Sequence, residues 1–112
     1  MNDDEDKALR QAAEAAVNGV DVVASAVKYL HRFTQAVDAG QIAWTEKPSP
    51  KGSRALEGKS PEFSAMVMQA RTPGGIDHSG IFVLNQPAEI TVVVMPKAMA
   101  VWVYRKASAS RN

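Results

Sequence analysis

Apolar residues recur with a helical period along the first third of the chain. Five of them stand seven residues apart: Leu9, Ala16, Val23, Leu30 and Val37. Apolar or small residues follow most of these three and four positions later, so the spacing predicts an amphipathic helix over residues 4–39, with Gly40 as its stop. The turn dipeptide Asn18-Gly19 interrupts this stretch and leaves open a kink or two shorter helices.

The next segment, residues 45–62, has no such periodicity and contains three prolines and two glycines. Loops of this length are uncommon in compact domains and are usually functional or disordered. Because Lys47, Lys51, Arg54 and Lys59 lie in it, we predict a flexible basic loop, functional or merely flexible. Just before it, residues 41–44 have the composition of a short strand.

Four runs with strand composition occupy most of residues 63–106, namely 63–71, 80–85, 89–95 and 99–105. Turn residues separate them, and the connections are too short for parallel crossovers. We therefore predict an α+β fold in which the long helix packs on an antiparallel meander of about four strands. Residues 107–112 are predicted to be a disordered tail, and the chain, 1–112, is the size of a single domain.

The strand at 89–95 is apolar on both of its faces. Ile90, Val92 and Val94 form one set, and Val93 and Met95 form the other. One helix covers one face of such a sheet, so the second face needs a partner, a curled sheet or a ligand. We predict a homodimer or higher oligomer. The predicted interface residues are Val93, Met95 and Trp102.

The overall composition is that of an ordinary globular protein, with 46% hydrophobic and 22% charged residues. Thirteen basic against twelve acidic residues leave a net charge of +1, which predicts no general affinity for nucleic acid. The absence of cysteine excludes disulfides and thiolate metal sites. An acidic start and the lack of a long apolar run predict a cytoplasmic protein with no membrane association.

Two short motifs contain residue types found in enzymes. Gly58-Lys59-Ser60 is similar to the end of a phosphate-binding loop, but Ser53 stands where that motif needs glycine. Asp77-His78-Ser79 contains the residue types of a hydrolytic triad, yet triad members meet through the fold and not as neighbours in a turn. We therefore predict no enzyme, no cofactor and no metal site.

Trp102 and Tyr104 stand two residues apart, on one face of the last predicted strand and close to a basic C-terminus. Aromatic rings on an exposed sheet stack on unpaired bases, whereas the commoner role of such rings is packing in a core or interface. Candidate residues for binding nucleic acid, another protein or a small anionic ligand are Trp102, Tyr104, Lys51, Arg54, Lys59, Arg71 and His78.

These observations favour a small, non-enzymatic, homo-oligomeric binding protein. Accessory factors of phages and mobile elements that sequester or inhibit a host component are one class of this kind. The alternative is a protein that binds single-stranded nucleic acid through Trp102, Tyr104 and the basic loop.

Overall fold

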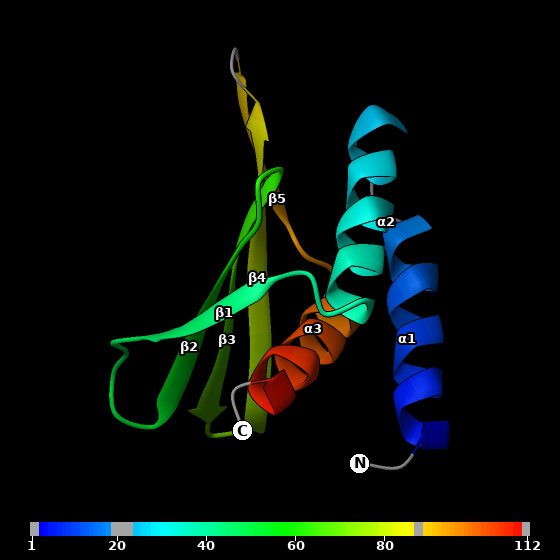
Figure 1. Cartoon of the computed structure of the whole chain (residues 1–112). Coiled ribbons are helices and arrows are strands. Elements are labelled where there is room, and N and C mark those ends of the chain that lie inside the picture. Colours follow the sequence, from blue (N-terminus) through cyan, green and yellow to red (C-terminus); the bar gives the residue numbers. More distant parts are fainter. Residues whose placement is uncertain (1–2, 19–23, 87–88, 111–112) are drawn as a thin grey trace.

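A computed structural model describes residues 3–18, 24–86 and 89–110, which form three helices and one five-stranded sheet (Figure 1). The helices are α1 (Asp3–Asn18), α2 (Ala24–Asp38) and α3 (Lys97–Ser110). The strands are β1 (Ala43–Lys47), β2 (Ser53–Lys59), β3 (Phe63–Thr72), β4 (Gly75–Gln86) and β5 (Glu89–Val94). The predicted α+β class is confirmed, with five strands where about four were expected.

The sheet is an antiparallel meander in the order β1-β2-β3-β4-β5. Its register places apolar residues of neighbouring strands side by side. Leu56 lies opposite Val67, and Phe82 lies opposite Val93. The predicted meander is therefore confirmed, and its register keeps these apolar residues of neighbouring strands on the same face of the sheet.

All three helices lie on one side of the sheet (Figure 1). Helix α3 crosses the strands: Lys97 at its start lies 3.0 Å from Asp77 of β4, and Ser108 near its end accepts a hydrogen bond from Arg54 of β2. Helix α1 packs against α3 on the side away from the sheet. We call the helix-covered face of the sheet the inner face and the opposite one the outer face.

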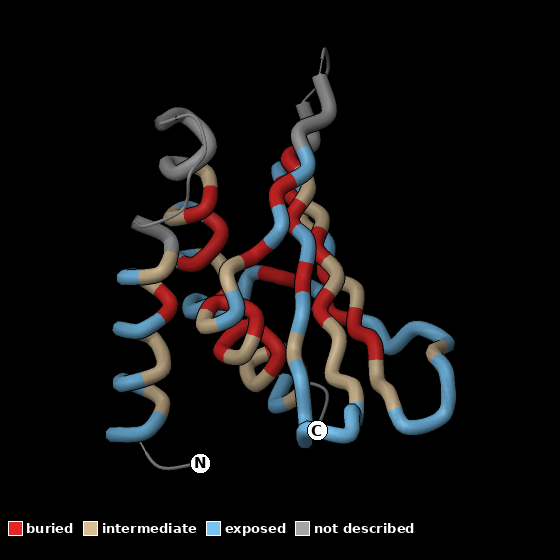
Figure 2. The backbone as a smooth tube through the Cα atoms, turned by 180° about the vertical axis from the view of Figure 1, so that it is seen from behind, coloured by how far each residue is buried: buried red, intermediate tan, exposed pale blue. Residues whose placement is uncertain are grey.

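The core lies between the inner face and helices α2 and α3, where buried residues concentrate (Figure 2). Phe33 of α2 packs on Phe63 and Phe82 of the sheet, with ring centroids 5.8 and 5.0 Å away. Burial of one such side chain contributes about 1.5–3 kcal/mol. The predicted packing of the N-terminal helical region on the sheet is confirmed, and α2 provides it.

The single helix expected over residues 4–39 is wrong, because two separate helices, α1 and α2, occupy this region. Arg10 in the middle of α1 pairs with Asp38 at the end of α2, and Glu14 lies 2.8 Å from His31. The two helices therefore fold back on one another. The turn dipeptide was the correct signal, although the residues that follow Asn18, 19–23, lie outside the described part.

The flexible loop expected at 45–62 is also wrong in its main part, since this segment contains the end of β1 and all of β2. Charge pairs join the two strands. Arg54 donates to Glu46 at 2.7 Å, and Lys47 lies 3.5 Å from Glu57. The prolines, which break a strand, fall in the turns before and after β2.

The last strand expected at 99–105 is instead helix α3, which begins directly after Pro96, as helices often do after proline. Residues on several sides of this helix are buried: Met99, Ala100, Trp102, Val103, Tyr104 and Ala107. A helix enclosed between a sheet and a second helix is apolar around most of its circumference. That is why its pattern resembled a two-sided strand, and the predicted disordered tail at 107–112 is ordered helix as far as Ser110.

Candidate functional site

The outer face carries a cluster of apolar side chains, and none of the three described helices lies above it. Two rows cross the strands there. Met66 of β3 lies opposite Ile81 of β4, which in turn lies opposite Val94 of β5. Val83 and Val92 form the next row. We call the following residues the outer patch: Met66, Met68, Ile81, Val83, Val92 and Val94.

Several side chains of the outer patch are more exposed than apolar residues usually are in a folded domain. Ile81 is 42% exposed, Val92 58% and Val94 72%. An apolar groove of about 280 Å³ lies among them, lined by Met66, Met68, Ser79, Gly80, Ile81 and Val94. Contiguous exposed apolar surface of this kind marks interaction sites, whereas single exposed apolar residues do not.

The rest of the outer face, over β1 and β2, is charged. Glu57 lies between Lys47 and Lys59, at 3.5 and 3.6 Å. The outer patch therefore has a polar border on this side, an arrangement typical of the core and rim of a protein interface.

A polar network lies on the inner face, under the C-terminal half of α3. Gln69 of β3 lies opposite Arg54 on one side and opposite His78 on the other. The Tyr104 hydroxyl donates to the Gln69 side-chain oxygen at 3.3 Å, and the Gln69 nitrogen lies 3.3 Å from Nε2 of His78. The Tyr104 and His78 rings are 5.2 Å apart. The network therefore joins α3 to three strands.

Partial burial lowers the pKa of His78, with Asp77 opposing this shift and the charges of Arg105 and Lys97 adding to it. At neutral pH its imidazole is therefore uncharged and accepts a hydrogen bond from the Gln69 amide. The hydrogen bond from Arg54 to Glu46 raises the pKa of Arg54. The network has the polar groups of a binding site, but they are bonded to one another and serve to hold α3 on the sheet.

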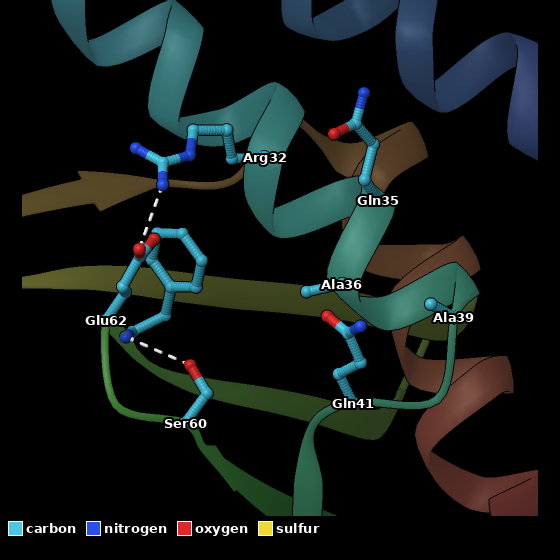
Figure 3. Close-up of a pocket in the computed structure, with 8 residues that line it drawn as sticks. Arg32, Gln35, Ala36, Ala39, Gln41, Ser60 and Glu62 are labelled. Atoms are coloured by element: carbon cyan, nitrogen blue, oxygen red, sulfur yellow. Dashed lines mark hydrogen bonds and ion pairs between the residues drawn. The ribbon is translucent and has the colours of Figure 1, made fainter.

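A polar cleft of about 420 Å³ opens between α2 and the β2–β3 turn (Figure 3). At its mouth Arg32 donates to Glu62 at 2.9 Å, so the two charges neutralise each other. The Ser60 hydroxyl accepts a hydrogen bond from the backbone N–H of Phe63 at 3.1 Å. The residues that line this cleft do not include a histidine or an activated nucleophile.

The structure buries both aromatic candidates of the sequence analysis. Trp102 is fully buried and Tyr104 nearly so, both on α3. Arg10 and Lys106 lie 5.2 and 6.0 Å from the centre of the Trp102 ring. In the alternative function these rings stack on bases from an exposed strand. That placement is wrong, because both rings are buried on a helix.

The basic candidates fall into two groups. Arg54 and His78 meet in the polar network, and the backbone N–H of Arg71 donates to Gly52 at 3.1 Å, next to Lys51 in the β1–β2 turn. Lys59 lies apart from them, at the other end of β2. None of them lines the apolar groove or the polar cleft, and Arg54 is already bonded to Glu46 and Ser108.

The residues expected at an oligomer interface, Val93, Met95 and Trp102, are buried within the subunit. Among residues 92–94 of β5, the exposed ones are the alternate pair, Val92 and Val94. The sequence showed two apolar sets on this strand, and we assigned the wrong one to the surface. Strand β3 contained a usable signal. Its residues alternate between the two faces of the sheet, so Met66 and Met68 lie on the face opposite to that of Phe63, outside the core.

Within residues 3–18, 24–86 and 89–110, no group of three or more histidine, aspartate or glutamate side chains could hold a metal ion. No helix in the same ranges is both long enough and apolar enough to cross a membrane. No protein-family model, curated protein or solved structure matches the chain. The outer patch is therefore the candidate site on geometry alone.

Proposed function

We propose that this protein is a non-enzymatic interaction protein that associates with a second copy of itself through the outer patch. The observation that carries the proposal is the absence of any covering element over the outer patch, in the part of the chain that the structure describes, while three helices cover the inner face.

Burial of the outer patch supplies the free energy of association. Removing apolar surface from water contributes about 25 cal/mol per Å², and the side chains of Val92 and Val94 are more than half exposed in one copy. A standard interface buries about 800 Å² on each partner, so the outer patch forms its apolar centre and the residues around it form the rim.

A second copy fits this surface better than a strongly charged partner. The outer patch itself contains no charged residue, and the charges that border it over β2, Glu57 and Lys59, are of opposite sign. With a net charge of +1 per chain, two copies approach one another with little long-range repulsion.

A matched pair of variants tests the proposal. Val94→Lys places a charge in the outer patch, and Thr45→Lys places the same charge on the outer face of β1, away from it. Both positions are exposed, so both variants should fold as the unaltered protein does. We expect light scattering to give a dimer for the unaltered protein and Thr45→Lys, and a monomer for Val94→Lys.

Two results would overturn the proposal. One is an unaltered protein that stays monomeric up to about 0.1–1 mM, the range in which even weak association becomes visible. The other is a dimer that Val94→Lys leaves intact, because its interface would then lie elsewhere.

A further inference from the structure

We infer that two copies pair through the free edge of β5, antiparallel and about a two-fold axis near Val92, to form one continuous sheet. The inference rests on the proposed function and names the part of the outer surface that makes the contact. It follows from the hydrogen-bonding pattern of β5, from the residues on the two sheet edges, and from the symmetry of the strand.

The backbone of β5 has hydrogen-bonding groups that its neighbour β4 does not use. The N–H of Met95 donates to the carbonyl of Gly80 at 2.8 Å, and Val93 lies opposite Phe82. In an antiparallel pair only every second residue bonds to the adjacent strand, so the N–H and C=O groups of Val92 and Val94 point away from β4. Since β5 is the last strand of the sheet, these groups lie at its free edge.

The two edges of the sheet differ in their protection against pairing. Edge strands that stay unpaired are usually short and contain charges or proline. Strand β1 fits that description, because it ends in Glu46 and Lys47 and is followed by Pro48. Strand β5 contains no proline and no charged residue after Glu89, and Pro87 and Pro96 both lie outside it in the sequence. Of the two edges formed by the described residues, the β5 edge is therefore the less protected against another strand.

The strand from Ile90 to Val94 complements itself. All five residues are β-branched, a class that packs well in cross-strand pairs. An antiparallel partner centred on Val92 places Val92 opposite its own copy and Val94 opposite residue 90. All outward-pointing backbone groups of the segment then find partners, and the register avoids Pro96, which has no N–H to donate.

This pairing also reduces the exposure of the Val92 and Val94 side chains, the part of the outer patch that lies on β5. Val92 and Val94 lie on the outer face, so the outer patches of the two copies meet across the seam between the two β5 strands. The most exposed apolar side chains of each copy become neighbours of one another. A second copy is the occupant that matches both the backbone groups and the side chains of this edge.

The direct test is amide hydrogen exchange of the unaltered protein at low and high concentration. In a monomer the amides of Val92 and Val94 face solvent and exchange fast, while that of Val93 is bonded to β4. We expect the exchange of the Val92 and Val94 amides to slow by about 10-fold or more as the dimer forms. Protection of the Val93 amide, the internal control, should be present at both concentrations.

A proline variant separates backbone pairing from side-chain burial. Val92→Pro removes an N–H that points away from β4, and edge strands tolerate proline at such positions. It should yield a monomer with an unchanged far-UV spectrum, whereas Val92→Thr, which keeps the N–H and the branched side chain, should remain dimeric. If Val92→Pro does not fold, the amide exchange still decides.

The two hypotheses fail in different ways. A dimer that persists in Val92→Pro, or fast exchange of the Val92 and Val94 amides in a dimer that Val94→Lys dissociates, would overturn edge pairing and leave self-association through the outer patch in place. A monomeric unaltered protein would overturn both.

Discussion

The two faces of strand β5 are both apolar in sequence and have opposite surroundings in the structure. On the inner face Val93 is 7% exposed, whereas its neighbour Val94 on the outer face is 72% exposed. Helices α2 and α3 enclose the first and nothing in the described part of the chain covers the second. In the described part of the chain, one side of the sheet is therefore enclosed by helices and the outer patch on the other side is not.

The comparison extends to the helices themselves. Helix α2 packs through Phe33 on two sheet phenylalanines. Helix α1 contributes the fully buried Ala13 to the core, and Leu9 packs against it. Ion pairs add to this contact, among them Glu5 with Arg105 and Asp6 with Lys106. Apolar contacts therefore hold α2 on the sheet, and ion pairs supplement the packing of α1.

The largest expected effect is the difference between adjacent positions of β5. Val93→Lys buries a charge without a partner, which costs several kcal/mol and should unfold the subunit. Val94→Lys should change the unfolding free energy of the monomer by less than about 0.5 kcal/mol. Circular dichroism during urea unfolding measures both, and equal effects at the two positions would contradict the assignment of the faces.

A smaller effect is expected at Gly58, on the inner face of β2. A Cβ added there would lie 2.6 Å from Cζ3 of Trp44 and 2.7 Å from Cγ2 of Ile42, so one of these side chains must move. We expect Gly58→Ala to lower the unfolding free energy by about 1–3 kcal/mol. At Gly74 an added Cβ meets only Thr72, at 3.9 Å, so Gly74→Ala should be close to neutral in the same urea titration.

Removal of one charge from the contact between α1 and α3 should lower the unfolding free energy by less than the Gly58 substitution does. Lys106 lies 3.3 Å from Asp6 and 3.8 Å from Asp38, with all three side chains partly exposed. Lys106→Met should reduce the unfolding free energy by about 0.2–1 kcal/mol, and the loss should shrink in about 1 M salt. Lys59→Met serves as the control, since Lys59 is mostly exposed. A loss at position 106 that salt does not reduce would mean that α1 is held by packing.

The smallest effect concerns the polar network and pH. The pKa of His78 is lower in the folded protein than its ordinary value of 6.5. As pH falls through about 6.5 the unfolded chain therefore takes up a proton before the native protein does, and stability decreases. His78→Gln, which stays uncharged, should lose less stability than the unaltered protein between about pH 7.5 and 5.5. An identical pH dependence in both proteins would show that His78 does not contribute.

The sequence predicted the fold class and the meander, because the runs that contain Phe63 and Phe82 have strand composition and short turns separate them. It failed where surroundings outweigh local pattern. The charge pairs that stabilise β1 and β2 join residues about ten apart, such as Lys47 and Glu57, and local composition does not reveal them. Helix α3 was mistaken for a strand because it is buried between two layers.

The candidate site was predicted in kind but not in its residues. The two apolar faces of β5 indicated an uncovered surface, yet alternation alone does not tell which face the helices cover. Once α3 lies on the side of Val93, the parity is fixed, and Val92 and Val94 are the exposed pair. The polar network depends on contacts between α3 and the sheet, such as that of Tyr104 with Gln69, that no linear spacing encodes.

A native mass spectrum of the purified, unaltered protein tests self-association most directly. Because it reports the mass of the intact assembly, it distinguishes a second copy from any other bound molecule. We predict a main species at twice the 12.0 kDa of one chain, with no additional mass. A single species at 12.0 kDa over a wide range of protein concentration would contradict the account, since the outer patch would then remain uncovered in solution.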